Sequence, residues 1–173
     1  MPEKLGLYIH IPFCRSKCDY CDFYSLPRQE GRMDDYTDAL CAHLAETAPF
    51  AAGHVVDTVY FGGGTPSCLG KGRLIKILKT VQKRYELAKD AEITLEANPD
   101  SAADWRELRA LRRAGINRIS LGMQSANGAE LEEIGRVHTP RQTADAVEAA
   151  RKAGFDNLSL DLIYGCLLYT SDA

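Results

Sequence analysis

The sequence predicts an α/β fold in which parallel strands alternate with helices, arranged as a barrel-like (β/α) sheet. Short apolar, β-branched segments alternate with amphipathic segments of about ten to fifteen residues, which is the pattern of repeated βαβ units. Unusual polar residues fall at or near the carboxyl ends of the expected strands. An open doubly wound sheet also fits the alternation of strands and helices, but it places its functional residues in one crevice. A (β/α) barrel places them at the carboxyl ends of all its strands. The spread of polar residues over every strand end therefore favours the barrel.

The expected elements follow one another along the chain in strict alternation. The first strand, at 5–11, is apolar and ends before Pro12, and the second ends at a run of glycines. Gly115 closes one helix, and Gly154 follows another. The strands are expected at 5–11, 55–61, 91–97, 117–121 and 158–163. The helices are expected at 34–48, 73–85, 104–114, 129–134 and 141–153.

Composition and charge exclude several classes of function. The 173 residues are 45% hydrophobic, which is enough for one domain with a buried core. Lys plus Arg total 21 against 24 Asp plus Glu, so the net charge of -3 gives no positive field to attract nucleic acid. No stretch approaches the roughly 20 apolar residues of a transmembrane helix, and the first residues lack a secretory signal layout. A cytoplasmic protein is expected.

Three cysteines that crowd into one short segment are the strongest chemical signal. Cys14, Cys18 and Cys21 can converge on one inorganic centre, and three thiolates suit an iron–sulfur cluster with one iron left open. A zinc site usually has four ligands in two separated pairs, so zinc would need His10 or Cys41 to complete it. A redox dithiol formed by the last two cysteines of the segment would leave the first one idle.

The segment from Tyr8 to Cys21 carries a family resemblance. It runs Tyr-Ile-His-Ile-Pro-Phe-Cys into a CxxxCxYC pattern, and it resembles the opening of the radical S-adenosylmethionine enzymes, in the branch around oxygen-independent coproporphyrinogen III oxidase. The resemblance covers residues 5–165 and implies a partial barrel with five of an expected six strands. It implies a [4Fe–4S] cluster on the three cysteines, whose open iron takes the amino and carboxylate groups of S-adenosylmethionine. Reductive cleavage would then yield a 5′-deoxyadenosyl radical.

The same resemblance implies a set of cofactor contacts at the strand ends. The segment Gly63-Gly64-Thr65 would hold the methionine amino group, and Glu96, which precedes Ala-Asn-Pro, would hydrogen-bond the cofactor. The other implied contacts are Tyr8, Tyr20, Gln124, Arg136 and Asp161. From the residues alone, the glycines could form only a tight turn, and the charged residues could be ordinary surface or strand-end groups. No catalytic acid, base or nucleophile is assigned, because the reactive species would be the cofactor's own radical.

The residues after Cys21 distinguish two branches of this family. Coproporphyrinogen oxidases of this type carry a further cysteine two positions after the third ligand, whereas this chain has Asp22-Phe23. In this feature the chain is similar to a sister group of heme chaperones, the HemW group. The resemblance implies heme or porphyrin as a ligand, with a reductant protein and respiratory heme acceptor proteins as partners. Porphyrinogen oxidation is the alternative, and a zinc-stabilised binding module is an alternative of another class.

The end of the chain departs from the family pattern. After Asp161-Leu-Ile-Tyr-Gly165 the family continues Leu-Pro-Gly-Gln, whereas this chain reads Cys-Leu-Leu-Tyr-Thr-Ser-Asp-Ala. We expect residues 1–165 to be the N-terminal part of an incomplete radical S-adenosylmethionine core. We expect residues 166–173 to be a truncated or non-native tail.

Overall fold

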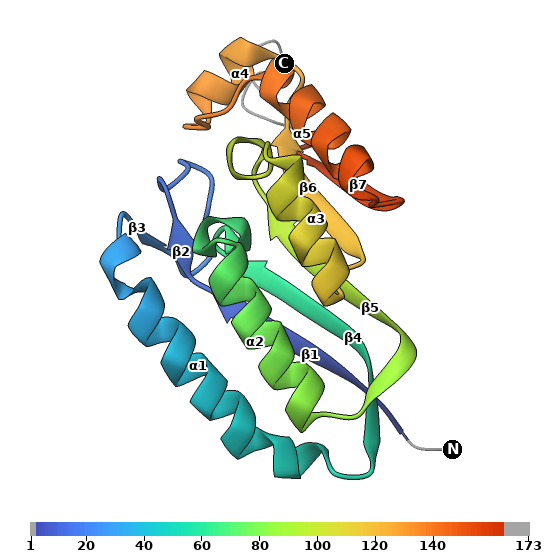
Figure 1. The fold of residues 1–173 in the computed structure, drawn as a ribbon. Helices are drawn as coiled ribbons and strands as arrows, with labels where there is room; N and C mark the ends of the chain where they lie inside the picture. The colour runs from blue at the N-terminus through green and yellow to red at the C-terminus, as the bar shows by residue number, and fades with distance from the viewer. Residues whose placement is uncertain (1–2, 165–173) are drawn as a thin grey trace.

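A five-stranded parallel sheet forms the centre of the computed structural model, which describes residues 3–164 (Figure 1). Its strands lie in the order β1-β4-β5-β6-β7, and each neighbouring pair is parallel. The strands are β1 (Glu3–Ile11), β4 (His54–Gly63), β5 (Leu87–Ala97), β6 (Arg118–Gln124) and β7 (Asn157–Leu162). Within the described residues β1 and β7 are the two edges, so the sheet is a partial and not a closed barrel. The expected α/β class is confirmed.

The helices that connect these strands pack side by side. Contacts join α1 to α2, α2 to α3 and α3 to α5, as expected when successive crossovers have the same hand (Figure 1). The helices are α1 (Met33–Thr47), α2 (Lys71–Arg84), α3 (Trp105–Ala114), α4 (Gly128–Glu133) and α5 (Pro140–Ala153). Short 3-10 turns follow or precede them at η1 (Glu30–Arg32), η2 (Ala48–Ala51), η3 (Pro66–Leu69) and η4 (Pro99–Ser101).

Local sequence signals explain where these helices begin and end. The Asp104 side chain accepts a hydrogen bond from the Arg106 backbone N–H and caps α3. Thr139 and Gln142 form a reciprocal capping box at the start of α5. Gly154 ends α5 in the left-handed conformation, with φ of 96°.

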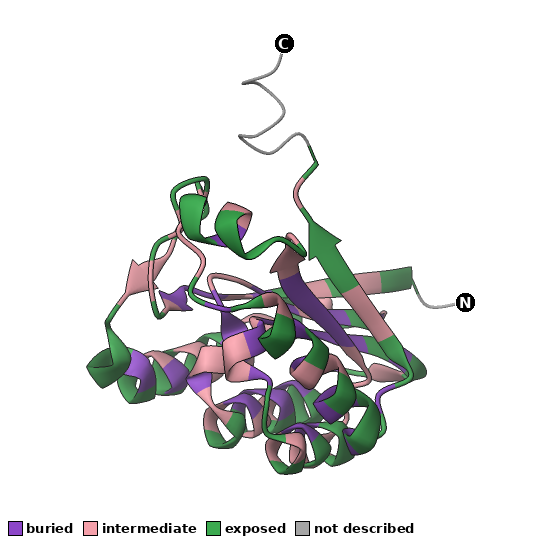
Figure 2. Ribbon diagram, turned by 90° about the horizontal axis from the view of Figure 1, so that it is seen from above, coloured by how far each residue is buried: buried purple, intermediate pink, exposed green. Residues whose placement is uncertain are grey.

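The hydrophobic core lies between the sheet and the helices, where Figure 2 shows the buried residues. Phe61, Leu95 and Ile119, each from a different strand, have no exposed surface. Side chains alternate across a strand, so the residues between these core positions point to the opposite face of the sheet. Within the described range, no helix is long and apolar enough to cross a membrane.

The face of the sheet opposite the core is lined with polar side chains. Arg118 Nη2 donates to Ser159 Oγ at 3.0 Å, and Ser120 Oγ donates to Asp161 Oδ1 at 2.9 Å. A doubly wound sheet would be covered by helices on both faces and would be apolar on both. A polar face indicates the interior of a barrel, which supports that choice between the two expected architectures. The expected tail at 166–173 lies outside the described residues.

Candidate functional site

The cysteine segment is a closed loop at the carboxyl end of β1. The two-residue strands β2 (Phe13–Cys14) and β3 (Leu26–Pro27) pair in parallel and join the two ends of the loop. The Arg28 backbone N–H also donates to the Cys14 carbonyl oxygen at 3.2 Å. The three thiols are thereby held on one short, closed segment.

A cavity of about 420 Å³ lies between this loop and the ends of the strands. All the site residues expected from the sequence line this cavity, except Tyr8. They are Cys14, Cys18, Tyr20, Cys21, Gly63, Gly64, Thr65, Glu96, Gln124, Arg136 and Asp161. The structure therefore brings residues from five strand ends into a single site.

The donor set of the loop fits an iron–sulfur cluster. The three thiols line the same cavity and are free, and burial raises the pKa of the Cys14 thiol. The hydrogen bond from Thr65 Oγ1 to Cys14 Sγ, at 3.6 Å, opposes that rise in pKa. A buried thiol becomes a thiolate readily when iron binds it, because metal binding releases its proton.

A single metal ion fits the same residues less well. Among residues 3–164, no three histidine, cysteine, aspartate or glutamate side chains are placed to hold one ion. A single zinc ion needs all its ligands about 2.0–2.3 Å from one point, whereas each thiolate of a cluster binds a different iron. The described residues therefore fit a cluster better than a single zinc ion. His10 is the histidine that could complete a zinc site. Its ring nitrogen Nε2 forms a hydrogen bond with the Tyr24 carbonyl oxygen at 3.0 Å.

The glycine segment at the carboxyl end of β4 contacts the cysteine loop directly. The Gly64 backbone N–H donates to the Ile11 carbonyl oxygen at 2.8 Å, and the Thr65 N–H donates to the Phe13 carbonyl oxygen at 2.7 Å. A Cβ added at Gly64 would lie 2.9 Å from Cys14 Sγ. The missing side chain permits this close approach of two backbones, so the segment is more than a tight turn.

Glu96 is the penultimate residue of β5, and it lines the cavity. Its oxygens accept hydrogen bonds from Tyr60 Oη at 2.7 Å and from the Gly63 backbone N–H at 3.2 Å. Burial is the largest influence on this carboxyl group and raises its pKa above the ordinary value, although the two hydrogen bonds oppose the rise. Burial and the same carboxylate raise the pKa of Tyr60, which therefore remains a hydrogen-bond donor.

Replacing Glu96 with glutamine is expected to raise the melting temperature of the ligand-free protein at pH 7. The folded-state pKa lies above the unfolded value of about 4.3, so ionisation destabilises the fold above the folded pKa and has no effect below the unfolded one. The difference between variant and wild type should close as the pH falls below about 4. Thermal melts at both pH values measure this. A variant that is less stable at pH 7 would show that the bonds from Tyr60 and Gly63 outweigh burial.

Gln124 and Asp161 stand at neighbouring strand ends. Gln124 has a φ of 64°, a left-handed conformation that is uncommon outside glycine, beside a register shift between β6 and β7. Strained backbone of this kind clusters at functional sites. Ser120 Oγ lies 2.9 Å and 3.1 Å from the two carboxylate oxygens of Asp161 and fixes their position.

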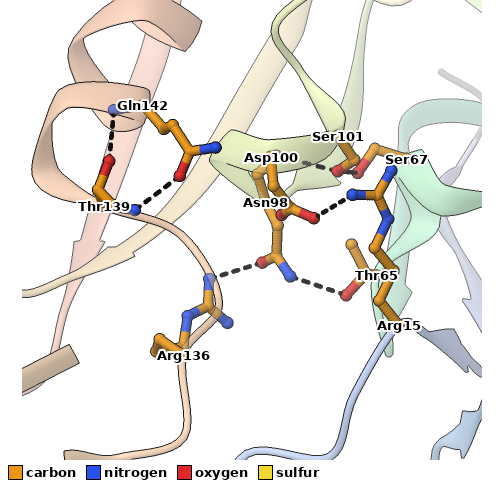
Figure 3. Close-up of polar contacts among 9 residues, drawn as sticks. All are labelled: Arg15, Thr65, Ser67, Asn98, Asp100, Ser101, Arg136, Thr139 and Gln142. Carbon is orange, nitrogen blue, oxygen red and sulfur yellow. Dashed lines mark hydrogen bonds and ion pairs between the residues drawn. The ribbon is translucent and has the colours of Figure 1, made fainter. Parts of the chain in front are cut away.

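Arg136, between α4 and α5, reaches back into the cavity. Its Nη2 donates to Asn98 Oδ1 at 2.8 Å (Figure 3). The same nitrogen donates to the Gly122 carbonyl oxygen at 2.7 Å. Its Nη1 lies 3.7 Å from Cys18 Sγ. Its Nε is buried and has no hydrogen-bond partner among residues 3–164, and the Arg136 side chain lines the cavity.

The two tyrosines expected beside the cofactor differ in their placement. Tyr20 lines the cavity, and burial together with the adjacent cysteine thiols raises its pKa to about 12. Tyr8 instead lies outside the lining, with 61% of its surface exposed and its ring stacked on Tyr60 at 6.2 Å between centroids. Tyr60 then contacts Glu96, so Tyr8 is one residue removed from the cavity wall.

Several cavity residues have no individual signal in the sequence. Three such residues line the cavity and form hydrogen bonds with expected site residues. Tyr60 pairs with Glu96, Asn98 with Arg136, and Ser120 with Asp161. Asn98 belongs to the Glu-Ala-Asn-Pro motif, and that position was the available clue. The other two became recognisable only when the register of the strands was known.

The fold and the three-cysteine site define a radical S-adenosylmethionine protein, and the chain belongs to this family. The sequence profile of the Radical SAM superfamily matches residues 8–170. Membership implies a [4Fe–4S] cluster and S-adenosylmethionine as cofactors. Heme chaperone HemW of Mycobacterium tuberculosis is 45% identical over 94% of this chain and 42% of its own length. Heme chaperone HemW of Escherichia coli is 43% identical over 93% of this chain and 43% of its own length.

A solved structure resembles the chain closely as well. Coproporphyrinogen III oxidase (HemN) from Escherichia coli, described as a radical SAM enzyme, aligns with a TM-score of 0.87 and 34% identity. The alignment covers 96% of this chain and 38% of that protein. The chain spans about two fifths of the length of these curated relatives.

Proposed function

We propose that the chain binds a [4Fe–4S] cluster through Cys14, Cys18 and Cys21, and binds S-adenosylmethionine in the adjoining cavity. The observation that supports this proposal is that the three thiols and the side chains from the other strand ends line one cavity of about 420 Å³. A reduced cluster supplies the electron that breaks a sulfur–carbon bond of S-adenosylmethionine. The chain's own residues bind and orient that ligand.

Charge and hydrogen-bonding capacity assign a role to each group of residues. Arg136 brings a guanidinium to the cavity lining, and its positive charge suits the methionine carboxylate. Gly63, Gly64 and Thr65 present backbone close to the loop and would hold the amino group. The remaining contacts are assigned to Glu96, Gln124 and Asp161 for polar groups, and to Tyr20 for the adenine, with Tyr8 stacked behind Tyr60.

We further propose that the protein is a heme chaperone like its HemW relatives. The supporting feature is a rim of exposed apolar side chains at the cavity. Phe23 and Val137 line the cavity with 68% and 57% of their surface exposed, beside the half-exposed Tyr20. Exposed apolar groups around a cavity indicate a ligand with a large flat apolar surface, and heme has one. The partners proposed are a reductant protein and respiratory heme acceptor proteins, and the location proposed for the protein itself is the cytoplasm.

Heme binding is expected to weaken about tenfold, or about 1.4 kcal/mol, when Phe23 is replaced by serine. The reason is that an aromatic side chain at the cavity rim loses its contact with the ligand. The matched control is Phe50→Ser, because Phe50 is 86% exposed on η2, away from the cavity. Titration of the reconstituted protein with hemin, followed by absorbance, measures the affinity. Wild type that binds no heme, or equal affinities in both variants, would contradict the proposal.

The second candidate function is oxygen-independent oxidation of coproporphyrinogen III. The likeness to the HemN structure favours it, whereas Phe23 stands where that branch carries a further cysteine. Porphyrinogen turnover with S-adenosylmethionine and dithionite would establish this activity. Heme binding without turnover would establish the chaperone.

A further inference from the structure

Asn98 bridges two side chains, each of which contacts a sulfur atom of the cysteine loop. Asn98 Nδ2 donates to Thr65 Oγ1 at 3.1 Å, and Asn98 Oδ1 accepts from Arg136 Nη2 at 2.8 Å (Figure 3). Thr65 Oγ1 lies 3.6 Å from Cys14 Sγ, and Arg136 Nη1 lies 3.7 Å from Cys18 Sγ. The five side chains form one arc from sulfur to sulfur, with Asn98 at its centre.

The chemistry of the groups fixes the direction of every hydrogen bond in this arc. A guanidinium has only donors, so the Asn98 oxygen must face Arg136 and the Asn98 NH₂ must face Thr65. The Thr65 oxygen then accepts from Asn98, and the single hydroxyl hydrogen remains for Cys14 Sγ. Asn98 thus orients one donor toward each of two sulfurs, and successive bonds in such a chain strengthen one another.

The backbone around Asn98 is held in place by independent contacts. The Ser101 backbone N–H and hydroxyl both donate to the Asn98 carbonyl oxygen, at 3.0 Å and 2.9 Å. Ser101 Oγ also lies 2.6 Å from Ser67 Oγ, next to the glycine segment. Asp100, whose side chain is only 8% exposed, forms an ion pair at 2.8 Å with Arg15 of the cysteine loop. These contacts tie the turn after β5 to both neighbouring segments of the site.

We propose that Asn98 is a positioning residue that sets the reduction potential of the bound cluster, by holding Thr65 and Arg136 as donors to the sulfurs of Cys14 and Cys18. The inference rests on the proposed cluster binding. Hydrogen bonds to ligand sulfurs tune the potential of iron–sulfur clusters. They favour the reduced state, because that state carries one more negative charge for the donors to stabilise. Loss of the arc should therefore lower the potential.

The test is the midpoint potential of the reconstituted chain, measured by EPR-monitored titration without S-adenosylmethionine. Asn98→Ala should shift the reduction equilibrium about tenfold, which is about 59 mV lower for one electron. Thr65→Val keeps the shape of the side chain but removes the hydroxyl, and it should also lower the potential. The double variant should fall by less than the sum of the single shifts, because both changes break the same path.

One conservative variant and one variant remote from the site serve as controls. Thr65→Ser keeps the hydroxyl and should retain the wild-type potential. Asn157→Ala removes an exposed amide that lies 3.4 Å from Glu92, at the opposite end of the sheet from the cavity, and should also have no effect.

The possible failures can be told apart. Wild type that takes up no iron would overturn the cluster assignment together with this inference. Wild type with a full cluster, and Asn98→Ala or Thr65→Val at the wild-type potential, would overturn the inference alone. If Asn98→Ala does not retain a cluster, the Thr65→Val potential decides in the same way.

Discussion

Replacing Cys18 with alanine is expected to abolish cluster binding. The anaerobically reconstituted wild type should hold about four irons and four sulfides, because its three thiolates line one cavity and leave a single iron open. With Cys18 gone, a second iron has no protein ligand, and the iron content should fall close to zero. Iron and acid-labile sulfide analysis measures this loss. Low-temperature EPR of the dithionite-reduced protein, before and after addition of S-adenosylmethionine, shows whether the ligand reaches the cluster.

Cys41→Ala is the matched control for this loss. Cys41 lies in α1, where its side chain packs against the core, and it does not line the cavity. This variant should retain the wild-type iron and sulfide. Zinc in place of iron and sulfide in the folded wild type would contradict the cluster and would support the zinc-stabilised module. Undiminished iron in Cys18→Ala would show that another residue completes the site.

The hydrophobic pattern predicted most of the fold because most of its helices and strands have one face in the core and one face outside it. Ile9 and Ile11 are buried at alternate positions of β1, and Val59 and Phe61 at alternate positions of β4, a repetition that is visible in the sequence. The paired strands β2 and β3 were not predicted, because two residues have no periodicity. Their pairing depends on the cysteine loop folding back on itself.

The site was predictable where a residue type is required by chemistry, and not where it depends on register. The three cysteines and the glycine segment could be recognised in the sequence because few other kinds of site require both features together. Tyr60 faces Glu96 only because β4 and β5 pair with a register shift, which spacing along the chain does not reveal. The left-handed conformation of Gln124 similarly arises at an irregularity between β6 and β7. The placement of Tyr8 behind Tyr60 has the same origin.

Replacing Gly64 with alanine is expected to destabilise the fold and to impair cluster binding together. The new Cβ would lie 2.8 Å from the Phe13 carbonyl oxygen, 2.9 Å from the Pro12 carbonyl carbon and 2.9 Å from Cys14 Sγ. Two of these neighbours are backbone atoms, so the contact is relieved only by moving the cysteine loop away from β4. Overpacking of this kind costs about 1–3 kcal/mol of unfolding free energy. The displaced Cys14 sulfur should in addition lower the iron content.

Gly72→Ala is the control that separates this steric effect from the general effect of adding a methyl group. Gly72 lies in α2, where an added Cβ would meet no neighbouring atom within 4 Å, so alanine there should stabilise the helix by up to about 1 kcal/mol. Denaturant unfolding of the cluster-free chains gives the two free energies, and iron analysis gives the occupancy. Because the substitution is the same in both variants, opposite signs of the stability change locate the cause in the contact between the glycine segment and the cysteine loop. Equal stability and equal iron content in the two variants would refute that contact.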